Sequence, residues 1–198
     1  IVAEDAAMPV PDGLDPDLAA LTEPLAVARH AVNRGDVGKR DPVVVVGCGP
    51  IGLAVVLMLK AAGVRRVIAS DYSPGRRRLA EACGADVVVD PGATSPWEVL
   101  AEEKGVVTSV TRLYGDGLDA LHALRRVPRL PWWTVVKAAQ RLGVGPRGPV
   151  VFECVGVPGV IDDIVTHAPF LSRVVVVGVC MEPDTFRPTM AVNKELDL

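Results

Sequence analysis

The sequence lacks the patterns that several classes of protein require. Its four cysteines stand far apart along the 198 residues, and no pair has the close spacing of a structural zinc site. The first residues contain neither the basic cluster nor the apolar segment of a signal peptide. The longest apolar helical stretch, around 51–59, is too short to cross a bilayer. We therefore expect a cytoplasmic protein.

Excess basic charge and clustered histidines are also missing. The formal net charge is −3, which gives no electrostatic reason to expect binding to nucleic acid or to an anionic membrane. The three histidines, His30, His122 and His167, are not grouped with other metal-ligating residues, and no nucleophile-elbow motif accompanies them. They are expected to be structural or solvated, so no histidine is assigned a catalytic role.

What the sequence does contain is a glycine turn between an apolar strand and a helix. Residues 43–46 are four consecutive valines, which is typical of a parallel strand buried on both faces. A Gly-x-Gly-x-x-Gly motif follows. In it, Gly47 permits the tight turn, Gly49 lets a pyrophosphate approach the backbone, and Gly52 lets the helix pack on the strand. The helix, over about 50–62, would point its free N–H groups and its dipole at the phosphate position.

A second apolar strand ends at an acidic residue. Asp71 lies 19 residues beyond Gly52, close to the interval of about 20 expected for a ribose-binding carboxylate. Such a carboxylate accepts hydrogen bonds from both adenosine ribose hydroxyls and repels a 2′-phosphate, which favours NAD over NADP. The arginines at 76–78 leave NADP open, because an arginine near this pocket can accommodate the phosphate. The simpler interpretation is that they form the solvated first turns of the next helix, so NAD stays the favoured coenzyme.

Alternating strands and helices predict an α/β fold along the rest of the chain. The strands are expected at 43–47, 66–70, 86–90, 150–154 and 173–178, and the helices at 25–34, 50–62, 75–83, 95–103 and 158–168. This order predicts a doubly wound parallel sheet, the Rossmann fold, with five to six strands and ligands at the carboxyl edge.

The connection between the third and fourth strands is unusually long. It contains helix-like pieces near 117–126 and 132–142 and a pair of tryptophans, Trp132 and Trp133. The tryptophans would mark an interface, a ligand patch or a small core within the insertion, and we favour the small core.

Several segments in order resemble the coenzyme-binding domain of the zinc-dependent medium-chain alcohol dehydrogenases, especially the polyol and threonine dehydrogenase branch. The segments are 14–32, 43–53, 80–86, 152–156 and 174–179, and the tail 193–198 resembles the start of that family's sixth strand. The resemblance implies that residues 1–24 are a remnant of a catalytic domain and that 25–198 form the dinucleotide-binding domain. Within the latter, 104–148 would be an insertion and 193–198 the start of a truncated final strand.

The resemblance also implies which residues hold the coenzyme. The positions at the glycine turn, the ribose and the adenine edge correspond to Gly47, Gly49, Pro50, Ile51, Gly52, Asp71 and Arg76. The backbone segments along the nicotinamide half correspond to Cys154, Val155, Gly156 and Val179. Glu23 corresponds to a glutamate close to the catalytic zinc of the full-length polyol enzymes. In this chain a helix N-terminal carboxylate is the simpler interpretation of Glu23.

The implied activity is oxidation of a small-molecule alcohol to a carbonyl by hydride transfer to NAD, with zinc in the full-length enzyme activating the hydroxyl and with a homo-oligomeric assembly. The cysteine and the His-Glu pair of that family's catalytic domain do not occur in these 198 residues. The chain alone is therefore expected to bind coenzyme without catalysis. Two alternatives remain open. One is a non-catalytic NAD-sensing regulatory module. The other is an S-adenosylmethionine-dependent methyltransferase, against which Gly52 argues because that motif usually lacks the third glycine.

Overall fold

The computed structural model describes residues 3, 5, 7–127, 131–141 and 148–198. Its five described strands form one parallel sheet in the order β3-β2-β1-β4-β5. The strands are β1 (Pro42–Val46), β2 (Arg66–Ser70), β3 (Val87–Val89), β4 (Val150–Glu153) and β5 (Arg173–Val176). The predicted doubly wound sheet is confirmed, and each strand lies within one residue of the expected range at its start.

Nine helices lie in the described part of the chain. They are α1 (Pro16–Ala19), α2 (Thr22–Arg34), α3 (Pro50–Ala61), α4 (Pro74–Ala82), α5 (Pro96–Ala101), α6 (Val110–Arg125), α7 (Trp132–Arg141), α8 (Val160–His167) and α9 (Pro188–Lys194). Patterning predicted neither α1 nor α9, which are short, and it placed the start of α6 seven residues late. None of the described helices combines the length and apolarity needed to cross a membrane.

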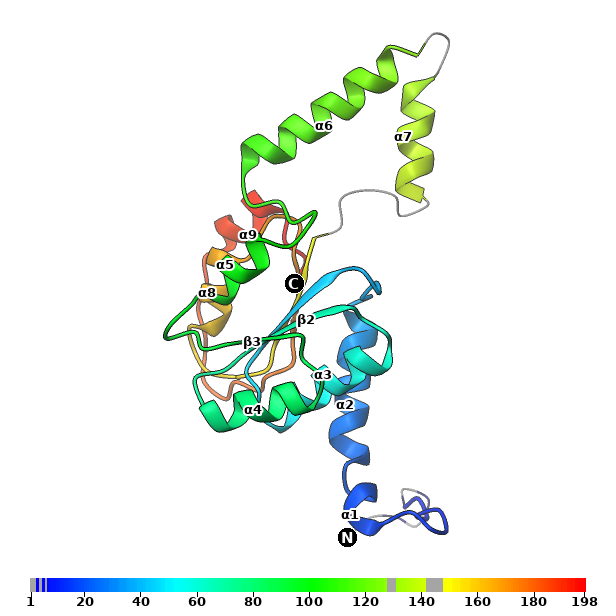
Figure 1. The fold of residues 1–198 in the computed structure, drawn as a ribbon, viewed down its shortest axis with the longest axis vertical. Helices are drawn as coiled ribbons and strands as arrows, with labels where there is room; N and C mark the ends of the chain where they lie inside the picture. Colours follow the sequence, from blue (N-terminus) through cyan, green and yellow to red (C-terminus); the bar gives the residue numbers. More distant parts are fainter. Residues whose placement is uncertain (1–2, 4, 6, 128–130, 142–147) are drawn as a thin grey trace.

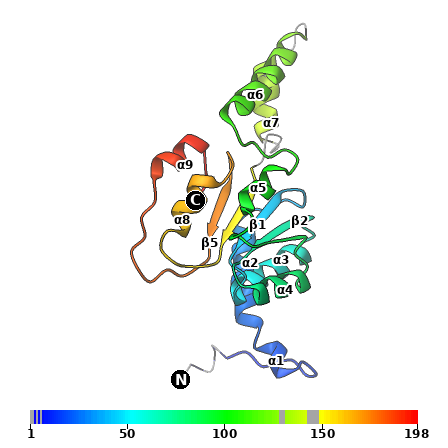
Figure 2. The same ribbon diagram turned by 60° about the vertical axis from the view of Figure 1, so that its left-hand side comes forward.

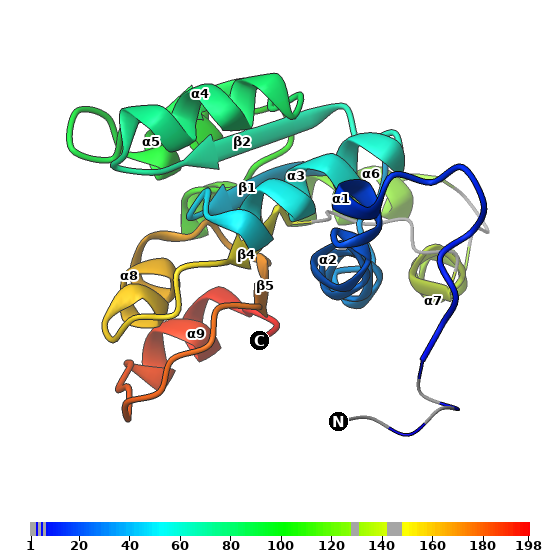
Figure 3. The same ribbon diagram turned by 90° about the horizontal axis from the view of Figure 1, so that it is seen from below.

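The valine run of β1 is continuous because helices cover both faces of the sheet. Val43 and Val45 pack against the layer that contains α2, α3 and α4, whereas Val44 faces α5 on the other side. Figure 1 shows α5, α8 and α9 on one side of the sheet and α3 and α4 on the other, Figure 2 shows α8 and α9 beside β5, and Figure 3 shows α2 next to α3. Burial on both faces holds the carboxyl ends of the strands in fixed positions.

At the outer edge of the sheet, Asp197 lies beside β5. It forms an isolated parallel bridge with Arg173, and its N–H donates to the Ser172 carbonyl at 3.0 Å. The predicted domain boundary between residues 24 and 25 falls within the first turns of α2.

Helices α6 and α7 form a hairpin that projects away from the sheet (Figure 1). Trp132 and Trp133 meet edge to face, with their ring centroids 6.0 Å apart. Trp133 is nevertheless 53% exposed, and no described residue between 108 and 138 is buried. The interpretation of the tryptophans as a small core is therefore wrong for the described part of the insertion, because the hairpin is too thin to exclude water.

Candidate functional site

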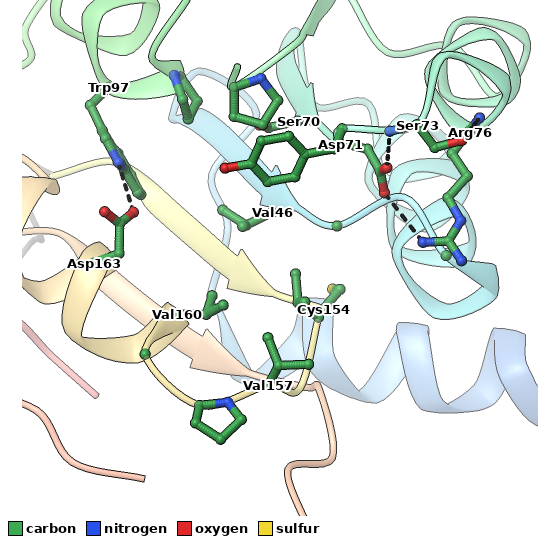
Figure 4. A pocket seen from close by; sticks show the side chains of 18 of the residues that line it. Val46, Ser70, Asp71, Ser73, Arg76, Trp97, Cys154, Val157, Val160 and Asp163 are labelled. Carbon is green, nitrogen blue, oxygen red and sulfur yellow. Dashed lines mark hydrogen bonds and ion pairs between the residues drawn. The ribbon is translucent and has the colours of Figure 1, made fainter.

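A pocket of about 850 Å³ opens at the carboxyl ends of the strands (Figure 4). It lies at the ends of the neighbouring strands β1 and β4, from which the chain continues toward opposite edges of the sheet. Parallel sheets of this kind bind ligands at such a switch point. The sequence-predicted residues among those lining the pocket are Gly47, Gly49, Pro50, Asp71, Arg76, Cys154 and Val155.

The glycines of the turn have different roles, because one is required for packing and another leaves space at the pocket. Gly47 has φ +92°, a conformation that strains other residues. A Cβ added to Gly52 would overlap the Gly47 carbonyl oxygen, so this glycine is required by the close approach of helix and turn. A Cβ added to Gly49 would meet no protein atom within 4 Å, and Gly49 lines the pocket. The protein itself therefore leaves room for a side chain at Gly49.

The first turn of α3 begins at the pocket, with Gly49 and Pro50 in the lining. Its N-cap residue, Gly49, makes no side-chain capping bond, and Pro50 occupies the first turn, where a missing N–H costs little. The remaining N–H groups and the positive end of the helix dipole suit a phosphate. Ile51 packs against the core below and does not line the pocket.

Asp71 links the glycine turn to the segment that follows β2. Its Oδ2 accepts from the Cys48 N–H at 2.8 Å, and its Oδ1 accepts from the Ser73 N–H at 2.7 Å. The side chain is largely buried but lines the pocket. A carboxylate has about four acceptor positions, so two backbone bonds leave capacity for further hydroxyl donors.

The three arginines of α4 have different surroundings. Arg76 lines the pocket, and its Nη1 lies 3.7 Å from Asp71 Oδ2. Arg77 instead supports the backbone, because its Nη1 donates to the Asp71 and Tyr72 carbonyls and its Nη2 pairs with Asp90 at 2.9 Å. Arg78 is not among the pocket residues. The interpretation of all three as solvated is therefore wrong for Arg77.

Glu153 was missed by sequence analysis, although its position at the end of an apolar strand is unusual. It is 1% exposed, and its Oε1 accepts from the Val155 and Gly156 N–H groups at 2.7 and 2.8 Å. Its main-chain carbonyl accepts from the N–H groups of residues 177 and 178. Glu153 thus joins the loop after β4 to the loop after β5.

These two loops are packed against each other. A Cβ on Gly156, whose φ is +70°, would lie 2.7 Å from the Val179 nitrogen. Gly156 and Val179, both predicted site residues, are therefore neighbours beside the pocket, and neither belongs to its lining.

Aromatic residues at the pocket also escaped prediction. Tyr72 follows Asp71 directly and is exposed into the opening. Trp97 of α5 lies across the pocket, where its Nε1 donates to Asp163 Oδ2 of α8 at 3.4 Å (Figure 4). The position of Tyr72, directly after a predicted ribose carboxylate, could have been recognised in the sequence. No local pattern places Trp97 at the pocket, because it comes from a different element.

The cysteines at the site are poor nucleophiles. Burial, with a smaller contribution from the Asp71 charge, raises the pKa of the Cys48 thiol to about 12. Burial also raises the pKa of Cys154, with the Glu153 charge acting in the same direction. Both thiols therefore stay protonated at neutral pH, and a protonated thiol neither attacks a substrate nor binds a metal readily.

Glu23 lies apart from the pocket. It occupies the exposed first turn of α2, where the helix dipole favours a carboxylate. Within the described residues, no three His, Cys, Asp or Glu side chains gather closely enough to hold a metal ion. The described residues do not fit a zinc site by themselves.

Comparison with known proteins supports the resemblance read from the motifs. Residues 50–124 match the profile of a family described as zinc-binding dehydrogenase. The (R,R)-butanediol dehydrogenase of Bacillus subtilis (strain 168) is 38% identical over 127 residues, which are 64% of this chain and 34% of that protein. The (R,R)-butanediol dehydrogenase of Neisseria gonorrhoeae (strain ATCC 700825 / FA 1090) is 31% identical over 191 residues, which are 96% of this chain and 43% of that protein.

A solved structure agrees with these matches. A candidate zinc-binding dehydrogenase from Sinorhizobium meliloti 1021, bound to NADP, superimposes with a TM-score of 0.64 at 27% identity, covering 95% of this chain and 45% of that one. The chain thus spans less than half the length of the relatives that it matches. The predicted relation to the zinc-dependent medium-chain dehydrogenases is confirmed.

Proposed function

We propose, because this chain is related to the zinc-dependent medium-chain dehydrogenases, that it is the NAD-binding part of an enzyme that oxidises a small alcohol or polyol. The observation that carries the proposal is the joint position of the glycine turn, the α3 N-terminus and Asp71 around one pocket. The relatives named butanediol dehydrogenase support a diol or similar alcohol as the substrate class.

Each group at the pocket has a distinct part in this proposal. The N–H groups of α3 would bind the pyrophosphate, which approaches closely because Gly49 has no Cβ. Asp71 would accept hydrogen bonds from the adenosine ribose, and Tyr72 and Arg76 would flank the adenine. Cys154, Val155, Gly156 and Val179 would lie along the nicotinamide half.

The chain's contribution to catalysis would be binding and orientation of the coenzyme. Zinc would polarise the substrate hydroxyl in the full enzyme, and its ligands would come from outside the described residues. Glu23 would approach that zinc only in the full-length enzyme.

Calorimetric titration of the chain with NAD, NADP and S-adenosylmethionine tests the proposal. We expect NAD to bind with one-to-one stoichiometry and S-adenosylmethionine not to bind. Tight binding of S-adenosylmethionine without NAD binding would favour the methyltransferase alternative and overturn the proposal.

The choice of NAD over NADP depends on the charge of Asp71. Asp71→Asn leaves one acceptor oxygen for the Cys48 and Ser73 N–H groups, so one of these bonds is lost, and it removes the charge that repels a 2′-phosphate beside Arg76. We expect the ratio of NAD to NADP affinity to fall at least tenfold, which corresponds to about 1.4 kcal/mol. Asp86→Asn is a matched control, because Asp86 pairs with Lys60 outside the pocket. An unchanged ratio in Asp71→Asn would show that another group sets coenzyme preference.

A further inference from the structure

The segment that contains the α6–α7 hairpin differs in charge from the rest of the chain. Residues 104–148 contain eight of the 21 Lys and Arg residues but only two of the 24 Asp and Glu residues. This stretch therefore has a formal charge of +6, and the remaining 13 basic and 22 acidic residues give −9. The prediction against membrane binding rests on the net charge of the whole chain, which averages these two unlike regions.

The hairpin also exposes a continuous apolar stripe. Val110, Tyr114 and Leu118 follow one another at four-residue intervals on α6, so they lie on one face of the helix, and they are 51%, 66% and 51% exposed. On α7, Trp133 is exposed and Trp132 is half-buried. A helix that is apolar on one face normally buries that face against another element.

Basic groups stand beside the aromatic ones. The Arg125 guanidinium lies 5.0 Å from the centre of the Trp132 ring, a cation–π contact that joins the end of α6 to the start of α7. Arg126 and Lys137 are exposed on the same hairpin. Amphipathic helices that combine Trp, Tyr and Leu with Lys and Arg are typical of segments that lie in the interface of an anionic bilayer.

We propose that the α6–α7 hairpin binds the surface of an anionic lipid bilayer. The tryptophans and the stripe of α6 would enter the headgroup region, and the basic residues would contact lipid phosphates. The acidic remainder of the chain opposes this binding only weakly. The 16-residue α6 is roughly 24 Å long, which is about three times the Debye length of about 8 Å at physiological salt.

The place of the hairpin in the fold suits this role. It leaves the sheet between α5 and β4, at the amino ends of the strands (Figures 1 and 2). The pocket lies at the carboxyl ends. A bilayer in contact with the hairpin would therefore leave the pocket open to solvent. Binding of the hairpin to a bilayer does not depend on what the pocket binds.

Co-sedimentation with vesicles tests the proposal. The chain would be mixed with vesicles of phosphatidylcholine alone or with about 30% phosphatidylglycerol, a content that gives a strongly anionic surface. We expect binding only to the anionic vesicles, lost in high salt. The double variant Arg126→Glu/Lys137→Glu should weaken it at least tenfold, because each basic group contributes to surface attraction. Trp133→Ala should weaken it several-fold.

The matched control is Arg29→Glu/Arg65→Glu. It makes the same change in net charge at two exposed arginines of the main body. We expect its vesicle affinity to stay within twofold of the unmodified chain. Equal losses in both double variants would mean that net charge alone governs binding and would overturn the proposal.

Removal of the hairpin gives a second test that does not rely on single side chains. The Phe170 N–H donates to the Val107 carbonyl at 3.0 Å, and a Cβ on Gly148 would overlap the Leu171 carbonyl oxygen. The two ends of the insertion therefore lie beside consecutive residues, and a short glycine–serine linker can replace 109–147. This variant should keep its circular dichroism melting transition and lose vesicle binding. Retained vesicle binding would overturn the proposal. So would hairpin-dependent self-association, seen by analytical ultracentrifugation, in a chain that ignores anionic vesicles.

Discussion

The sheet with its pocket and the α6–α7 hairpin are two differently built regions of one chain. In the sheet, residues far apart in sequence bury one another, and the carboxyl edge is held by buried groups such as Glu153. In the hairpin, helices form from local patterning, and none of its described residues between 108 and 138 is buried. Geometry suited to holding a ligand therefore arises in the region where burial fixes the side chains. The hairpin instead leaves its side chains exposed, where they can contact a bilayer.

The largest expected difference in stability is between substitutions at two glycines of the same motif. Gly52→Ala would force a Cβ into the Gly47 carbonyl, a backbone atom that cannot move aside. We expect at least about 3 kcal/mol of destabilisation, or failure to fold, measured by urea unfolding.

Gly49→Ala is the matched variant. Its backbone, at φ −71° and ψ −175°, suits alanine, and the added methyl meets no protein atom. Its stability should stay within about 0.5 kcal/mol of the unmodified chain. Its NAD affinity should fall at least tenfold, if the pyrophosphate approaches here. Equal effects of the two substitutions on stability would contradict this division of tasks.

A pair of leucines in the same connection compares the two regions directly. Leu100 of α5 is fully buried under the sheet, whereas Leu118 of α6 is 51% exposed. Leu100→Ala should cost about 3 kcal/mol, because it leaves a cavity. Leu118→Ala should change the free energy of unfolding by no more than about 0.5 kcal/mol. A large loss from Leu118→Ala would show that the hairpin is buried against the rest of the chain in solution.

The sequence predicted the sheet well because its signals are local. The strands and the turn were predicted from local patterns, which are a run of valines, a glycine motif and an acidic residue at a set interval. Each of these patterns depends only on residues near it in the sequence. The partners of Glu153 and the approach of Trp97 to Asp163 join residues of different elements, and no local pattern encodes them. The hairpin tryptophans were misjudged for the same reason. Their pattern predicts an apolar face, but burial depends on what lies opposite.

Glu153 provides the next prediction. Glu153→Ala removes the acceptor for two N–H groups and should destabilise the chain by about 2 kcal/mol. It should also weaken NAD binding, because the loops after β4 and β5 lose their common anchor. Glu153→Gln keeps an acceptor oxygen and should recover most of both losses. Hydrogen exchange at the Val155 and Gly156 amides provides the readout, since these protons should exchange faster in Glu153→Ala than in Glu153→Gln. Similar exchange in both variants would mean that the charge, and not the hydrogen bonds, holds the loop.

The smallest expected effect is on the pH dependence of stability, through the Cys48 thiol, which is buried in the sheet region. Cys48 has its pKa raised from 9.0 to about 12, so the folded chain holds this proton more tightly than the unfolded chain. The resulting stabilisation is complete below pH 9 and is lost as the pH rises from 9 to 12. Between pH 8 and pH 10 the free energy of unfolding should therefore fall by about 1 kcal/mol more in the unmodified chain than in Cys48→Ala. Leu118→Ala, altered in the hairpin, should follow the unmodified chain. If the free energy of unfolding of the unmodified chain and of Cys48→Ala changed in parallel with pH, water would reach the thiol. The glycine turn would then be more open to solvent than the buried strands next to it.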